Sequence, residues 1–146
     1  MGLTAGIHAI SRTSYDAAIA ANPTGFEVDT SVESIDLDKA WHAIHYLTTG
    51  DASLTFLLSG SQIGGVPEHC EVHAPESLKA LDLELAARSL EDIMSGFRAD
   101  IFAELQIYPD GWSNDMTRYV AQHLERFLRK LHEIVEHGLG MLVVIH

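Results

Sequence analysis

Histidines are the first side chains in this sequence that could do chemistry. His42 and His45 lie three positions apart, which on a helix places both rings on one face. Neutral imidazoles so placed can bind zinc, and His69 and His73 could complete the site. The chain has neither an HExxH motif nor a CxxC pair. We therefore predict no metal and no cofactor, with one of the pair a hydrogen-bonded core histidine beside Trp41 and the other exposed.

The single cysteine, Cys70, is the only candidate thiol nucleophile. Such a nucleophile needs a histidine base close in space. His69 precedes Cys70, but adjacent residues on an extended chain point to opposite faces. No GxSxG, GxGxxG or P-loop motif is present either. The sequence thus predicts no catalytic residue and favours a protein that is not an enzyme.

Acidic residues dominate the charge of the chain. It carries 21 acidic and 9 basic side chains, for a formal net charge of -12, which disfavours nucleic-acid and anionic membrane partners. One segment of twelve residues holds five acids and no base: Glu27, Asp29, Glu33, Asp36 and Asp38. We predict a non-catalytic binding or regulatory module of the immunity or antagonist type, in which Asp29, Glu33 and Asp36 meet a basic protein partner. The alternative that these charges only keep the protein soluble stays open.

A second reading places function in a pocket. Lys39, His42, His45, Tyr108 and Trp112 have polar tips that could line a small-molecule site or an active site. In this alternative Trp112, beside a Pro-Asp-Gly turn, is partly exposed. A deep cleft in which these tips converge would favour it, whereas a flat acidic face would favour protein binding.

Basic side chains gather on one predicted helix and could form a cationic stripe. They are Arg118, Arg126, Arg129 and Lys130. Because Glu125, Glu133 and Glu136 interleave with them, we expect a solvated face of weak ion pairs instead.

Composition limits the protein class. The chain has 146 residues, 47% hydrophobic and 21% charged, which suits one globular domain over residues 1–146. A lone cysteine cannot form an internal disulfide, the first residues lack a secretory signal pattern, and no apolar run is long enough to span a membrane. We expect a cytoplasmic location.

The elements that would position these residues begin with a strand over 3–10, where apolar residues alternate. A capping box of Thr13 and Asp16 predicts a helix over 13–21, followed by a surface loop over 24–36. Asp36 is a good N-cap for a helix that ends at Thr49-Gly50.

The middle of the chain is less regular. Residues 53–58 have no clear pattern, and 71–73 favour a short strand. Pro75 opens a helix, short helices are predicted over 90–94 and 99–105, and 107–111 is a turn.

The strongest periodic signal is an apolar stripe from Met116 to Val135, which predicts one long amphipathic helix ended by Gly138. The run 141–145 after it predicts a strand buried on both faces and central in its sheet. The expected fold is α+β: a small mixed sheet that includes the N- and C-terminal strands, packed by several helices with one long C-terminal helix.

Two blocks carry a resemblance to a known family. Residues 37–50 read LDKAWHAIHYLTTG, with an acid, a lysine, a tryptophan, paired histidines and a closing Thr-Gly. Ile107-Tyr108-Pro109 and Trp112 form the second block. The chain resembles the YfbM-like family, known only as a domain of unknown function, over nearly its whole length, with departures at 51–73. The resemblance implies a fold and brings no activity, cofactor or site residue.

Overall fold

The computed structural model describes residues 2–20, 26–57, 60–63 and 69–146. Its strands form one sheet in the order β2-β1-β5-β4-β3, with every described pairing antiparallel. The strands are β1 (Ala5–Ile10), β2 (Ile35–Asp36), β3 (Ser61–Gln62), β4 (His69–His73) and β5 (Gly140–Ile145). The α+β class and the place of both terminal strands are confirmed. The sheet is antiparallel and not mixed. Strands β1 and β4 run in the same direction, but β5 separates them and pairs antiparallel with each.

The first helix and the loop after it differ in detail from expectation. Helix α1 spans Arg12–Ile19, and its N-cap is Ser11, whose hydroxyl accepts from the Ser14 N–H, so the predicted Thr13 cap is wrong. The predicted end of this helix, residue 21, lies outside the described residues. The loop predicted over 24–36 contains β2, which pairs with residues of β1 far away in sequence. Tertiary pairing thus overrides the weak local pattern.

The tryptophan-bearing helix starts later than predicted. A 3-10 turn, η2 (Asp38–Ala40), precedes α2 (Trp41–Thr49). The predicted Asp36 N-cap is wrong, because the cap positions are Leu37 for η2 and Ala40 for α2; the Asp36 carboxylate instead accepts from the Asp38 N–H at 2.6 Å in a local turn. Gly50 ends α2 with a φ of 75°, the left-handed conformation that glycine adopts without strain.

The remaining helices agree closely with the sequence patterns. They are α3 (Pro75–Ala86), α4 (Leu90–Met94), α5 (Ala99–Glu104), the 3-10 turn η3 (Asn114–Met116) and α6 (Thr117–Glu136). Pro75 stands in the first turn of α3, where its missing N–H is not needed. Between residues 105 and 114 the Tyr108-Pro109 peptide bond is cis.

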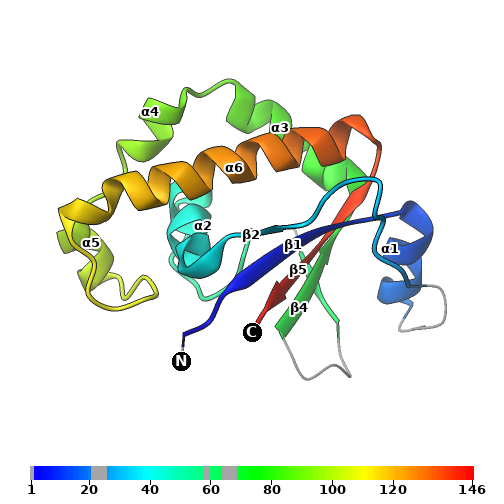
Figure 1. Ribbon diagram of the computed structural model, residues 1–146, viewed down its shortest axis with the longest axis horizontal. Helices are drawn as coiled ribbons and strands as arrows, with labels where there is room; N and C mark the ends of the chain where they lie inside the picture. The colour runs from blue at the N-terminus through cyan, green and yellow to red at the C-terminus, as the bar shows by residue number, and fades with distance from the viewer. Residues whose placement is uncertain (1, 21–25, 58–59, 64–68) are drawn as a thin grey trace.

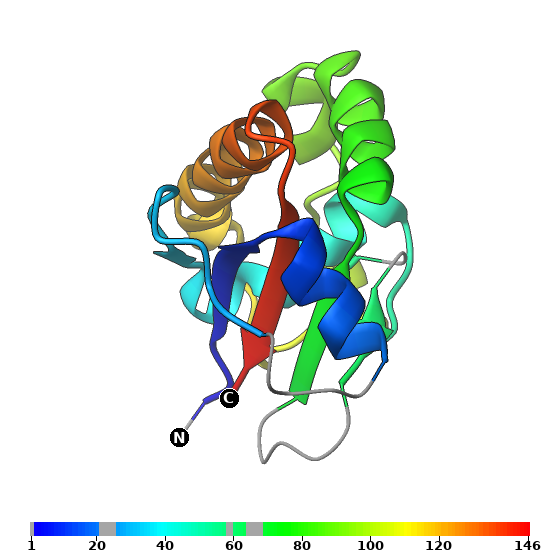
Figure 2. The same cartoon turned by 90° about the vertical axis from the view of Figure 1, so that its right-hand side faces the viewer.

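The sheet has helices on both faces (Figures 1 and 2). On one face α2, α3 and α6 enclose the main core, and α6 runs the length of the molecule. On the other face α1 packs over a smaller apolar cluster that includes Ile10, Val72 and Leu142. As predicted, β5 is central and buried on both faces, and its end lies beside the N-terminal segment through two backbone hydrogen bonds between Thr4 and His146.

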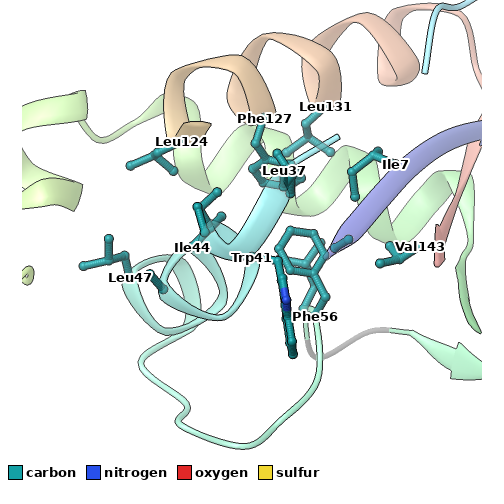
Figure 3. Close-up of a cluster of buried hydrophobic side chains, with 14 of the residues drawn as sticks. Ile7, Leu37, Trp41, Ile44, Leu47, Phe56, Leu124, Phe127, Leu131 and Val143 are labelled. Atoms are coloured by element: carbon teal, nitrogen blue, oxygen red, sulfur yellow. The ribbon is translucent and has the colours of Figure 1, made fainter. Parts of the chain in front are cut away.

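Helix α6 supplies the centre of the main core. Figure 3 shows Leu124, Phe127 and Leu131 pointing from α6 toward α2 and the sheet, as the apolar stripe predicted. Phe127 meets Phe56 edge-to-face, with ring centroids 5.2 Å apart. Among the helices of the described residues, none has the length and apolar composition needed to cross a membrane.

Candidate functional site

Helix α2 lies inside the molecule, and its two histidines are fully used by the protein itself. His42 is buried and stacks on Trp41, with ring centroids 5.3 Å apart. Its Nδ1 accepts from the Tyr108 N–H at 2.7 Å, and its Nε2 lies 3.0 Å from the carbonyl oxygens of both Ala52 and Ser53. One ring therefore joins two separate loops to α2.

His45 repeats the arrangement one turn later. It is also buried, so the expectation that one of the pair is exposed is wrong. Its Nδ1 accepts from the Leu57 N–H at 2.8 Å, and its Nε2 lies 2.8 Å from the Asp51 carboxylate. Backbone groups of an irregular loop need partners when they are buried, and the two imidazoles supply them.

Glu71 on β4 is a buried acid that the sequence pattern did not single out. Its exposed fraction is 3%. The carboxylate accepts from the Thr55 hydroxyl and from the Phe56 N–H at 3.3 Å, and it lies 3.2 Å from His69 Nε2. The available signal was the strand itself, since alternation places Glu71 and His73 on the face that points to the main core.

These contacts share one target, residues 51–57, here called the clasped segment. It has no helix or strand of its own, yet Phe56 and Leu57 are buried. Within it Ser53 hydrogen-bonds Asp51 Oδ2, and His45 from α2 hydrogen-bonds the same oxygen. A serine nucleophile needs its histidine between the hydroxyl and the acid, and here the acid lies between the other two. The arrangement fits a structural clasp and not a catalytic triad.

The pocket predicted around the other candidate tips is not assembled. Trp112 is buried, with 9% of its surface exposed, and its indole donates to the Ile107 carbonyl at 2.8 Å, so the expected partial exposure is wrong. The Tyr108 hydroxyl accepts from the Leu3 N–H. Lys39 is exposed, and its side chain lies beside Gly2 and the Tyr108 hydroxyl. The two histidines point into loops, so the five tips do not converge on one cavity.

Cys70 lies on the opposite face of β4 from Glu71. Its side chain is buried in the smaller apolar cluster beneath α1. The neighbouring His69 is directed toward Glu71 and Gln62. As strand alternation predicted, His69 is not placed to activate the thiol.

The acidic residues lie elsewhere, on the segment that leads through β2 to α2. Glu33 and Asp36 are exposed and Asp29 is half-buried. Hydrogen bonds from the Ser31 N–H and hydroxyl hold the pKa of Asp29 below its ordinary value. The fifth acid, Asp38, accepts from the Tyr119 hydroxyl at 2.8 Å and has a positive φ of 51°. The structure thus spreads the acids along one edge of the sheet, from Asp29 near His137 at one end of α6 to Asp38 at Tyr119 near the other, apart from the histidine clasp.

Helix α6 faces this edge with charges of both signs. The Arg126 guanidinium donates to the Asp36 carbonyl at 3.3 Å. Arg129 pairs with Glu125 at 3.5 Å, and Lys130 pairs with Glu133. The helix therefore has the mixed, ion-paired face that the interleaved glutamates predicted.

We predict that removal of metal ions leaves stability unchanged. Within the described residues no group of three or more histidines, cysteines or acids converges on a point, and the nitrogens of His42 and His45 are engaged by the protein. Purified protein treated with a chelator should keep its melting temperature. A chelator lowers the melting temperature only when it removes an ion that stabilises the fold. Differential scanning calorimetry with and without added zinc measures this. A fall in melting temperature that zinc reverses would show a site that we have not placed.

Comparisons with known proteins agree with this fold and name no activity. A family model described as a domain of unknown function, DUF1877, matches residues 1–144. No curated protein matches the chain in sequence. The crystal structure of YfbM, a protein of unknown function from Escherichia coli, is similar with a TM-score of 0.67. The match covers 98% of this chain and 99% of that one at 15% identity, so it shows the fold alone.

Proposed function

The chain belongs to the DUF1877 family, and since that family's description assigns no activity, we propose from the residues themselves that it is a non-catalytic binding module whose acidic edge receives a basic protein. The observation that carries the proposal is the placement of the acids. Glu33, just before the edge strand β2, and Asp36, within it, are exposed, and the sequence has no lysine or arginine between residues 27 and 38. An unbalanced, exposed row of one sign attracts partners of the other sign.

The use of the histidines supports binding over catalysis. General acid–base work requires a ring nitrogen that can reach a substrate. His42 and His45 each use both nitrogens on groups of this chain, and the rings are buried. Of the side chains in the alternative pocket, only Lys39 is exposed.

The field of this edge has a defined range. Charges at a protein surface act over about 10 Å at moderate ionic strength, and they mainly speed encounter. Arg126 reaches the Asp36 backbone and reduces the negative potential at that end of the row. Asp29 and Glu33 lie earlier in the chain, form no ion pair with a lysine or arginine among the described residues, and should dominate the attraction.

We predict that neutralising the row slows association. The triple variant Asp29→Asn, Glu33→Gln, Asp36→Asn removes three charges and should reduce the association rate constant by about tenfold at low salt, within the range of electrostatic steering. The salt dependence of that rate constant should flatten as well. The ligand is the basic protein that wild-type chain captures from its native host, and surface plasmon resonance over a salt series gives the rates.

A charge-matched control separates this edge from net charge. Glu91, Glu104 and Asp110 are exposed acids on the α4 and α5 side of the molecule. Their triple neutralisation changes net charge by the same amount and should leave the association rate nearly unaltered. Equal rates for the edge variant and wild type, with both folded, would refute the proposed surface.

A further inference from the structure

Two loops are held to α2 by imidazole nitrogens that accept backbone N–H groups. His42 Nδ1 lies 2.7 Å from the Tyr108 nitrogen, and His45 Nδ1 lies 2.8 Å from the Leu57 nitrogen. An imidazole nitrogen can accept a hydrogen bond only while it carries no proton. Both rings must therefore be neutral in this structure, with the proton on Nε2.

The Nε2 edges of the rings agree with that tautomer. His42 Nε2 faces two carbonyl oxygens, which can only accept, and His45 Nε2 faces the Asp51 carboxylate. Each ring thus donates on one edge and accepts on the other. The clasped segment is tied to both rings, and the turn at Tyr108 is tied to His42.

We propose that His42 and His45 form an acid-operated latch, in which protonation at Nδ1 releases the clasped segment from α2. A proton on Nδ1 turns the acceptor into a donor, so that two N–H groups point at each other. A buried donor without an acceptor is strongly unfavourable, and the loop backbone regains partners by moving into water. Opening would uncover Phe56 and Leu57, which are buried while the latch is closed.

Four charged or titratable groups lie around the latch, and they affect its opening in different ways. Asp51 accepts from His45 Nε2 whether or not Nδ1 is protonated, and its charge opposes the lowering of the His42 pKa by burial. Glu71, from β4, holds Thr55 and Phe56 and keeps the far end of the segment in place. The Tyr108 hydroxyl is engaged with Leu3, and His73 lies on β4 beside Glu71.

Burial gives the direction of the pH dependence. It lowers the pKa of His42, with hydrogen bonds to Ala52 and Ser53 opposing the effect, and it lowers the pKa of His73 to about 4. A histidine whose pKa is depressed in the folded state contributes stability above its unfolded pKa of about 6.5, and that contribution is lost as the pH falls. His73 lies on β4, and its pKa also reflects a contact with the Phe56 backbone, so its protonation would act on both the sheet and the clasped segment. Because the folded protein keeps His73 neutral down to a pH of about 4, the clasped segment should open at a higher pH than the sheet.

Solution NMR of ¹⁵N-labelled protein tests the latch. At about pH 7.5, His42 and His45 should both show the Nε2–H tautomer. As the pH falls below about 6.5, the protection factors of the Leu57 and Tyr108 amides, which compare the measured exchange rate with the intrinsic rate at the same pH, should fall at least tenfold. The amides of Leu131 and Val143 should keep their protection over the same range. Loss of protection at all four positions together, or an Nδ1–H tautomer at neutral pH, would overturn the proposal.

Variants assign the effect to the two rings. In His42→Asn with His45→Asn, each amide oxygen can accept a backbone N–H and cannot be protonated, so the pH-dependent acceleration should disappear. His137 is exposed and lies beyond α6, and His137→Gln should retain the full transition. A double variant that opens with the wild-type pH profile contradicts the latch. If that variant does not fold, His42→Asn alone and the wild-type tautomers decide the question.

Discussion

Replacing Leu131 with alanine should lower the free energy of unfolding by about 2 to 5 kcal/mol, the range for deleting a buried leucine side chain. Leu131 has an exposed fraction of 1% and lies in the middle of the α6 stripe. Figure 3 shows it pointing into the same cluster as Ile7 and Val143 of the sheet, so surrounding elements cannot easily close the cavity. Urea denaturation followed by circular dichroism measures the change.

Leu83 provides the matched comparison on α3. Its exposed fraction is 67%, so Leu83→Ala should change stability by less than about half a kcal/mol, as for an ordinary surface substitution. The two variants carry the same chemical change and differ only in burial. Similar midpoints for both would mean that α6 does not pack through Leu131.

Long periodic elements could be predicted from the sequence because their information is local. The stripe that ends near Val135 and the apolar run 141–145 each satisfy one period over their length, and α6 and β5 follow them closely. Strands β2 and β3 have two residues each, and they exist because β1 and β4 supply partners. Nothing within such a short stretch distinguishes a strand from a loop.

The candidate site was predictable only in part, for a related reason. The spacing of His42 and His45 indicated a shared helical face, and both rings do point from α2 into loops. What they contact depends on the path of the clasped segment, which has no periodicity. The structure supplies the reason for these contacts, because a segment that buries Phe56 and Leu57 without regular structure must pair its backbone with side chains.

The mistaken expectations concern polar residues in the interior. Trp112 was expected to be partly exposed beside its turn, but the indole donates to Ile107 and the ring lies edge-on against Phe97 and Phe102. His45 belongs to a helix that is buried almost all round. A helix with polar residues on two sides suggests a surface position, and here the loops cover the polar side. Side-chain type alone did not show which loop would do so.

Glu71 was missed for the same reason, and its replacement provides the other large expected effect. Glu71→Met keeps a side chain of similar length and removes both acceptor oxygens. The Phe56 N–H and the Thr55 hydroxyl then lose their partner beneath the clasped segment. With about 1 to 3 kcal/mol for each buried donor left unsatisfied, and partial relief by water at Thr55, the expected loss of stability is about 2 to 4 kcal/mol.

Glu71→Gln separates hydrogen bonding from charge. Its amide oxygen can accept from the Phe56 N–H while the Thr55 hydroxyl rotates to accept from the amide nitrogen, so the loss should be about 1 kcal/mol. Glu84→Gln, an exposed acid on α3, controls for the removal of one negative charge. Denaturant unfolding of the three variants should therefore rank Met well below Gln, and Gln slightly below the control. Equal stability of the Met and Gln variants would mean that Glu71 does not hold the clasped segment through hydrogen bonds, because Gln can still make such bonds and Met cannot.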